Sequence, residues 1–288
     1  MPLILDERPR AGARLRTQPA NAGVVSWNTS ASHGALAVRV RFDDESWSKT
    51  LPYVRWDERS RMSLGGRDTN ARFETDVLLT TQPFTAIEVE ASTKLDALAL
   101  ATPPLQQRPY ESKLEPIELD VPMRSQYVGD PGRGWCSPAS LAMLLAANGV
   151  EIGVGEAAAA TYDDAYHGTG NWAFNTAFAS RFRLRSFVAF LRDLAHARLF
   201  LAAGVPLALS FAWKKGELDN APLDESDGHI AVLRGFDDGG NPIFNDPAQA
   251  TIRTIYPRRQ FEKLWLEHRG TAYVIAPRDE PVVALANA

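Results

Sequence analysis

Cys136 is the only cysteine among the 288 residues, and its neighbours predict that it stands at the start of a helix. Ser137 can cap a helix and Pro138 suits the first helical position, while Asn148 and Gly149 stop the mostly apolar run that follows. At a helix N-terminus, unpaired backbone N–H groups and the helix dipole favour a thiolate, the nucleophilic form of cysteine. Cys136 is therefore a candidate nucleophile, although a lone cysteine can also be a small buried apolar side chain.

A hairpin later in the chain brings a histidine and a carboxylate together. The strand-like runs Gly228–Phe236 and Asn241–Asp246 are joined by a turn-favouring sequence. A two-residue loop would place His229 opposite Asp246, whereas a four-residue loop would place Asp246 opposite Ala231, with His229 on the diagonal of the same sheet face. Only an odd loop without a compensating bulge would separate them. Such a pair orients an imidazole and stabilises its protonated form.

Four parts of a thiol-dependent site can be assigned to these residues. A cysteine nucleophile needs a base, the base needs an orienting acceptor, and the tetrahedral oxyanion needs donors. Cys136 would attack, His229 would relay the proton, and Asp246 would fix the histidine tautomer. The side-chain amide of Gln126 and the backbone N–H of Cys136 would form the oxyanion hole. Alternatively, Gln126 only bonds a loop and Asp246 only shapes the turn before a proline.

Other titratable residues fit these roles less well. Asn245 would point to the opposite face of its strand from Asp246. His196 is expected to be solvated, His268 to lie at the surface, and His167 to sit in a glycine-rich loop where it could line a cleft. None has a carboxylate at hairpin spacing. No Cys/His cluster has the spacing of metal ligands, so we expect neither a zinc site nor a cofactor.

Composition indicates an ordinary globular chain. Hydrophobic residues are 45%, charged residues 23%, and the formal net charge is -4. This balance gives no reason to expect a nucleic-acid partner, and no apolar run approaches the roughly 20 residues of a membrane span. The acid- and proline-containing start does not resemble a signal peptide, which indicates a cytoplasmic protein unless a leader was removed earlier. The compartment stays open.

The chain divides by composition into a strand-rich and a mixed half, an α+β organisation. We expect an extended arm over residues 1–20, a small antiparallel β-sandwich over 21–105, a proline-rich linker over 106–116, a second domain over 117–277 and a tail over 278–288. In the second domain, we expect a helix from about Ser186 to Ala203 and a buried strand from Leu207 to Trp213.

The strand-rich half is also rich in aromatic side chains. Trp27, Trp47, Tyr53 and Trp56 are expected to fill or edge its core, because aromatic residues dominate the cores of small β domains. The alternative is a platform that contacts glycan.

Several short motifs together resemble the peptidase C39-like family of papain-fold cysteine peptidases. The resemblance covers roughly Ile117 to Pro277, and the upstream half looks like the β domain that accompanies this family in some bacterial proteins. The motifs are Gln126, Gly134–Ser140 (GWCSPAS), Gly170–Asn175 (GNWAFN), Gly228-His229 and Asn245–Pro247 (NDP).

The resemblance implies a cysteine peptidase acting on a peptide or protein. It implies Cys136 as nucleophile, His229 as general acid and base and Asp246 as its orienter, with Gln126 as oxyanion-hole donor. The best-known relatives cut leader peptides after a double glycine and are fused to membrane transporters, whereas this sequence contains neither a span nor an ATPase, so substrate identity does not transfer.

Three further residues are candidates for the substrate groove, namely Trp135, Asn171 and Trp172, although core packing accounts equally well for Trp172. Two alternatives to a peptidase stay open. One is an acyltransferase or amidase that uses the same site, and the other is a non-catalytic protein that binds glycan or cell wall.

Overall fold

The computed structural model describes residues 1–128 and 134–288. Residues 129–133, which belong to the predicted loop between Gln126 and Cys136, lie outside the described part. Contacts divide the described chain into two compact units. The first contains Met1–Pro103, Thr161–Val188 and Asn287, and the second contains Pro104–Ala160, Ala189–Ala286 and Ala288. This division differs from the predicted one, because Thr161–Val188 was expected to belong to the second domain.

The first unit is built on an antiparallel sheet. Within the described residues it has eight strands in the order β1-β8-β2-β7-β3-β4-β5, and β6 pairs with β7. The strands are β1 (Leu3–Asp6), β2 (Ala13–Asn28), β3 (Gly34–Phe42), β4 (Leu51–Trp56), β5 (Arg61–Ser63), β6 (Ala71–Glu74), β7 (Val77–Ala91) and β8 (Ala97–Ala101).

This sheet folds over on itself, so the predicted β-sandwich is confirmed as two layers of one continuous sheet. The hydroxyl of Tyr53 in β4 donates to the backbone oxygen of Val25 in β2 at 2.9 Å, although β7 and β3 separate these strands in the sheet. Trp27 packs edge-on against Tyr53 and stacks on Trp56, with ring centroids 6.0 and 5.3 Å apart. Trp27 and Tyr53 therefore fill the core and the half-buried Trp56 lies at its edge, as expected, while Trp47 lies against the Arg14 and Arg39 guanidinium groups.

Both chain ends differ from the prediction. Residues 1–20 form β1 and the first part of β2 in place of an extended arm, because Leu3, Ala13 and Leu15 are buried in the sheet. The alternation of Ala13 and Leu15 with arginines was a strand signal that the arginine content obscured. The predicted tail contains the short helix α6 (Val282–Ala286), whose first and last residues are buried.

Within the first unit, the segment Thr161–Val188 is joined to the strand-rich part of the chain by hydrogen bonds from Asp76. It contains helix α3 (Trp172–Ser180). The carboxylate of Asp76, between β6 and β7, accepts the backbone N–H groups of Trp172 and Ala173 at 2.6 and 3.1 Å. Because these N–H groups have no partner inside the helix, Asp76 acts as a cap supplied from the strand-rich part of the chain.

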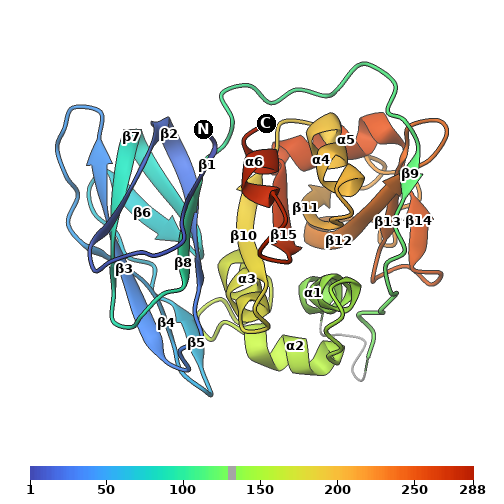
Figure 1. The fold of residues 1–288 in the computed structure, drawn as a ribbon. Coiled ribbons are helices and arrows are strands. Elements are labelled where there is room, and N and C mark those ends of the chain that lie inside the picture. The colour runs from blue at the N-terminus through green and yellow to red at the C-terminus, as the bar shows by residue number, and fades with distance from the viewer. Residues whose placement is uncertain (129–133) are drawn as a thin grey trace. The chain divides into compact units, whose positions relative to one another are not determined.

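The second unit is a mixed helix and strand domain (Figure 1). Its sheet has the order β10-β15-β11-β12-β13-β14, and β9 pairs with β12. In the view of Figure 1, helix α1 lies below this sheet and helices α4 and α5 lie above it. The elements are β9 (Ile117–Glu118), α1 (Cys136–Ala147), α2 (Val154–Thr161), β10 (Arg185–Phe190), α4 (Leu194–Ala202), β11 (Leu207–Trp213), β12 (Ser226–Phe236), β13 (Pro242–Asn245), β14 (Arg253–Ile255), α5 (Arg258–Glu267) and β15 (Thr271–Ala276). The division into units falls inside two of them, because Thr161 of α2 and Arg185–Val188 of β10 are counted with the first unit.

The predicted helix from Ser186 to Ala203 is correct only in its second half. Its first residues belong to β10, where Ser186–Phe190 are all buried, and the helix α4 begins at Leu194. Asp193 caps α4 by accepting the backbone N–H of His196 at 2.7 Å. The cap signal was present in the sequence, but the continuous apolar run hid the boundary between strand and helix.

Candidate active site

Helix α1 begins at Cys136, as its sequence predicted, but its N-cap residue is Trp135, which makes no side-chain cap hydrogen bond. Ser137, predicted to cap the helix, instead has its hydroxyl 3.0 Å from that of Tyr273 in β15. Pro138 is the third helical residue and lacks an N–H at a position that needs no intrahelical bond. The helix therefore starts two residues earlier than a Ser137 cap would allow, with the thiol in its first turn.

The first turn of α1 is fixed to β12. Ser140 lies one helical turn after Cys136, and its buried hydroxyl donates to the backbone oxygen of Ile230 at 3.0 Å. The backbone of the same residue, Ile230, hydrogen-bonds the sulfur of Cys136. Since His229 precedes Ile230 in β12, these two contacts bring the thiol to the imidazole.

Cys136 and His229 interact through a side-chain hydrogen bond. Burial raises the pKa of the Cys136 thiol, but the hydrogen bond with His229 and the charge of the imidazolium lower it by more, so the pKa lies below its usual value. The site thus favours a thiolate–imidazolium pair, the reactive form of a cysteine nucleophile.

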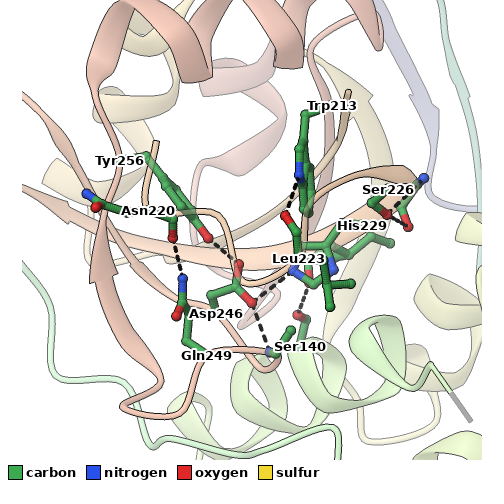
Figure 2. A network of polar contacts seen from close by, with 12 residues as sticks. Ser140, Trp213, Asn220, Leu223, Ser226, His229, Asp246, Gln249 and Tyr256 are labelled. Atoms are coloured by element: carbon green, nitrogen blue, oxygen red, sulfur yellow. Dashed lines mark hydrogen bonds and ion pairs between the residues drawn. The ribbon is translucent and has the colours of Figure 1, made fainter. Parts of the chain in front are cut away.

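His229 is also bonded to Asp246, which follows β13 directly. The Nε2 atom of His229 lies 2.8 Å from Oδ1 of Asp246, and both side chains are buried (Figure 2). Because Nε2 faces the carboxylate, Nδ1 is the ring nitrogen left for the thiol.

The register of the hairpin explains why these side chains meet. Phe236 pairs with Pro242 across a five-residue connection, and a bulge between Leu233 and Gly235 then shifts the pairing so that Asn245 lies opposite Val232. Continued by one residue, this register places Asp246 opposite Ala231, with His229 on the diagonal of the same face. An odd loop and one bulge therefore produce the arrangement predicted for a four-residue loop.

The charges of the histidine and aspartate stabilise each other. Burial lowers the pKa of His229, but the Asp246 carboxylate and its hydrogen bond outweigh burial and raise the pKa to about 10. Burial likewise raises the pKa of Asp246, whereas the His229 charge and hydrogen bonds from His229, Tyr256 and Ala248 hold it below its usual value. His229 is therefore protonated and Asp246 ionised at neutral pH.

Tyr256 is a member of this network that the sequence analysis missed. Its hydroxyl donates to Oδ2 of Asp246 at 2.6 Å, and the backbone N–H of Ala248 donates to Oδ1 at 2.9 Å. Tyr256 lies between β14 and α5, where no periodic pattern distinguishes one tyrosine from another. Only the three-dimensional packing of α5 on the hairpin reveals it.

Two aromatic rings of β11 cover the imidazole, and they were also missed. Phe211 pairs with His229 in the sheet, and the rings of Phe211 and Trp213 lie edge-on to His229 with centroids 5.4 and 5.5 Å away. The Trp213 indole donates to the backbone oxygen of Leu223 at 3.0 Å (Figure 2). This bond holds the loop between β11 and β12 against the site. These rings keep water from one side of the His229–Asp246 pair.

A model of the peptidase C39-like family matches residues 118–273, more than half of the chain. The chain belongs to the peptidase C39-like family. Its second unit, with most of this match, has the papain-like cysteine peptidase fold expected from the motifs, and the α+β class with a preceding β domain is confirmed.

Three solved structures resemble part of this C39-like chain. A Bacillus anthracis protein described as a C39-like peptidase is 18% identical, with 57% of this chain and 99% of that chain covered and a TM-score of 0.44. A double-glycine-motif protease from an AMS/PCAT transporter, in complex with the leader peptide, is 18% identical over 57% and 99% of the two chains, with a TM-score of 0.39. The peptidase domain of Streptococcus ComA, a bifunctional ABC transporter, is 16% identical over 54% and 98%, with a TM-score of 0.40. No curated protein matches the chain.

Gln126 lies beside the aspartate turn of the C39-like domain. Its backbone N–H donates to the oxygen of Pro247, the residue after Asp246, at 3.0 Å. The side chain is buried, and its Oε1 atom has no hydrogen-bond partner among the described residues. Oε1 can only accept a hydrogen bond, so an oxyanion-hole role for this side chain would fall to its other amide atom, Nε2.

The three predicted groove residues differ in position. Trp135 is partly buried and packs against Ala139, Ala142 and Val154 beside the thiol helix. Asn171 is fully buried and caps α3 by accepting the N–H of Phe174 at 3.1 Å, while its amide donates to Asp163 at 2.9 Å. These bonds give Asn171 a structural role as a helix cap, and its role in a substrate groove stays a prediction. Trp172 is half-buried in the first unit.

Two of the rival histidines, His196 and His268, have their contacts outside this network. His196 was expected to be solvated but is buried, with Nε2 2.7 Å from the backbone oxygen of Leu285 and Nδ1 accepting the N–H of Arg192 at 3.3 Å. His268 is half-buried, and burial lowers its pKa. Asn245 bonds Val121 and Arg234.

Across residues 1–128 and 134–288, no cluster of three or more acidic, histidine or cysteine side chains could hold a metal, and no helix could span a membrane.

Proposed function

We propose that this C39-like chain is a cysteine peptidase that hydrolyses a peptide or related amide bond through a thioester on Cys136. The observation that supports this proposal is that hydrogen bonds link the side chains of Cys136, His229 and Asp246 in a row. The thiol at one end of this row lies at the start of helix α1. A structural cysteine has no need of a buried imidazolium and its counter-ion, because their burial is unfavourable without a function or full pairing.

In the first chemical step, the thiolate of Cys136 would attack the carbonyl carbon of the scissile amide. The carbonyl oxygen becomes an oxyanion, which the backbone N–H of Cys136 and the side-chain Nε2 of Gln126 would stabilise. The imidazolium of His229 would then give its proton to the leaving nitrogen. The C–N bond breaks, the amine departs and a thioester is left on Cys136.

In the second step, neutral His229 would take a proton from water, and the resulting hydroxide equivalent would attack the thioester carbon. Collapse of the second oxyanion breaks the C–S bond, releases a carboxylic acid and restores the thiolate–imidazolium pair. Asp246 keeps its charge throughout and holds Nε2 of His229, which leaves Nδ1 directed at the sulfur. Trp135, next to the nucleophile, would contact the substrate.

The decisive experiment uses the fact that Cys136 is the only thiol, so that iodoacetamide reports on it alone. We expect the wild-type chain to be alkylated at pH values well below the usual thiol pKa of about 8.5, and the His229→Ala variant to lose this reactivity at low pH. His268→Ala is the matched control, because this histidine is half-buried and outside the network. An unreactive thiol at neutral pH, or equal profiles in both variants, would falsify the proposal.

Hydrolysis is then tested with peptide mixtures and mass spectrometry. The wild-type chain should release products with a free carboxylate, and Cys136→Ala should release none. Addition of a competing amine distinguishes peptidase from acyltransferase, because an acyltransferase would form the amide of the added amine as its main product.

A further inference from the structure

We propose that Tyr256 is a positioning residue of the catalytic network, whose hydroxyl keeps Asp246 ionised and directs its Oδ1 atom at His229. This inference rests on the proposed peptidase function and assigns to it a residue that the family motifs do not include. The hydrogen bond in question runs from the Tyr256 hydroxyl to Oδ2 of Asp246, the carboxylate oxygen that does not face His229.

The carboxylate of Asp246 receives donors on both oxygens. Oδ1 lies 2.8 Å from Nε2 of His229 and accepts the backbone N–H of Ala248 at 2.9 Å, while Oδ2 accepts the hydroxyl of Tyr256 at 2.6 Å. A carboxylate held by one oxygen alone can rotate about its terminal torsion, which is broad and two-fold. The Tyr256 bond to the second oxygen fixes this rotation, so Oδ1 stays in line with the imidazole.

The ring of Tyr256 is itself immobilised. It is fully buried and stacks on Phe261 of α5 at an interplanar angle of 8° and a centroid distance of 6.1 Å. Phe244 of β13 and Phe211 of β11 contact it at 5.5 and 6.1 Å. Three elements therefore determine where the hydroxyl lies, and Asp246 is held by a rigid donor.

The electrostatics of the pair fit this role. Burial and the neighbouring carboxylate raise the pKa of Tyr256 far above its usual range, so the phenol remains a donor at neutral pH. The titratable groups facing Asp246 are His229 from β12, Tyr256 before α5 and the more distant Cys136 of α1. Of these, His229 and Tyr256 lower the Asp246 pKa, and Tyr256 does so without changing charge.

Loss of the hydroxyl should weaken the whole relay. Without it, the carboxylate is free to turn about its terminal torsion, and Oδ1 is no longer kept in line with the imidazolium. The thiolate–imidazolium pair then forms only at higher pH. We expect Tyr256→Phe to move the pH midpoint of Cys136 alkylation upward by less than about one unit, because a hydrogen bond shifts the pKa of the charged group that accepts it by about that much and Cys136 senses the change only through His229. The value of kcat should fall while KM changes little.

The matched control is Tyr53→Phe. Tyr53 is also a fully buried tyrosine whose hydroxyl donates to an acceptor at 2.9 Å, but it lies in the first unit and bonds Val25. It measures the stability lost with a buried phenol hydrogen bond, and its alkylation midpoint should equal that of the wild-type chain.

A double-mutant cycle tests whether Tyr256 acts through the carboxylate. If it does, Tyr256→Phe should shift the alkylation midpoint in the wild-type background but not in Asp246→Asn. Should Tyr256→Phe fail to fold, replacement of Tyr256 by 3-fluorotyrosine keeps the ring and makes the phenol a stronger donor, which should move the midpoint downward.

A folded Tyr256→Phe with an unchanged midpoint, or an equal shift in the Asp246→Asn background, would overturn the inference. In either case, loss of low-pH reactivity in His229→Ala would leave the peptidase proposal standing. If His229→Ala also has no effect, the peptidase proposal fails as well.

Discussion

The hydroxyl of Ser140 and the backbone oxygen of Ile230 lie 3.0 Å apart, and this bond joins the thiol helix to the strand that carries the histidine. Cys136 occupies the preceding turn of the same helix, and its sulfur bonds the backbone of the same strand residue. Alignment of thiol and imidazole thus depends on one turn of α1 meeting one residue of β12.

Removal of this bond should reduce reactivity more than stability. We expect Ser140→Ala to lower the free energy of unfolding by about 1 kcal/mol, the usual net value of a buried hydrogen bond. It should also slow alkylation of Cys136 at neutral pH, because the first turn of α1 is no longer fixed to β12. Ser137→Ala is the control, since this hydroxyl on the same helix contacts Tyr273 of β15. Equal effects of both changes on reactivity would contradict the expected role of Ser140.

Gly235 allows the close approach of β9 at the bulge that sets the hairpin register. A Cβ atom there would lie 2.4 Å from the backbone oxygen of Ile117 and 2.9 Å from Cα of Glu118. We therefore expect Gly235→Ala to reduce the free energy of unfolding by about 1–3 kcal/mol, as overpacked sites do. Gly228→Ala, on the same strand with no atom within 4 Å, should change it little. Denaturant unfolding measures the free energy of unfolding of both variants. Similar values would contradict the expected clash and would mean that β9 can move away from residue 235.

Asp76 should make the stability of the chain depend on pH. Burial raises its pKa to about 7, against the opposing backbone N–H groups of Ala173 and Trp172. Because the folded pKa exceeds the unfolded value of about 3.9, stability from this group is lost as the pH rises from about 4 to about 7. Asp76→Asn cannot ionise, so the variant should gain stability relative to wild type across that range.

Asp68→Asn is the control for this prediction. Asp68 is half-buried in the strand-rich unit, and hydrogen bonds from the backbone of Lys49 and Thr69 lower its pKa. Its stabilising contribution is lost only as the pH falls below about 4, so the difference from wild type should be constant at higher pH. Thermal unfolding at several pH values distinguishes the two slopes, and a flat difference for Asp76→Asn would show that its carboxylate ionises freely.

The stability that His229 contributes through its pairing with Asp246 should fall as the pH rises, whereas the stability contributed by a buried neutral histidine falls as the pH drops. The relevant group is His229. Its pKa of about 10 means that the stabilisation is complete below the unfolded pKa of about 6.5 and is lost as the pH rises toward about 10. Unfolding of Cys136→Ala and Cys136→Ala/His229→Gln isolates this effect from titration of the thiol. The difference between them should shrink between about pH 6.5 and 9.

His268→Gln in the Cys136→Ala background provides the comparison. Burial lowers the pKa of His268, so its contribution is lost only as the pH falls below about 6.5 and should be constant above about pH 7. A constant difference for His229→Gln over the same range would mean that the imidazole is neutral in the folded chain.

The sequence predicted the local parts of the site better than their surroundings. The place of Cys136 near the start of α1 follows from Pro138 and the apolar run after it, although the cap residue differs, and the His229 hairpin follows from strand alternation and a turn. The bulge near Arg234 could not be predicted, because it depends on pairing of Gly235 with both β9 and β13, and β9 is more than 100 residues earlier. The five-residue loop and the bulge each shift the strand register by one residue, and together they leave His229 and Asp246 on the same face, as predicted.

Residues that act through packing could not be found in the same way. Tyr256, Phe211 and Trp213 surround the His229–Asp246 pair from separate elements, and each is an ordinary apolar or aromatic residue in its own segment. Conversely, Asn171 belongs to a convincing motif but is a helix cap inside the first unit. Motif membership identified a residue that the fold requires without showing whether the requirement is structural or chemical.

The chain leaves the strand-rich unit after Pro103, re-enters it at Thr161 and departs again after Val188. A protease that nicks the backbone within residues 104–116 would therefore not release an autonomous N-terminal half, since the helix that Asp76 caps would remain on the other fragment. Exchange of β domains between relatives by a single recombination junction would sever a folding unit for the same reason. Shuffling of this architecture requires that both stretches of the strand-rich unit be inherited together.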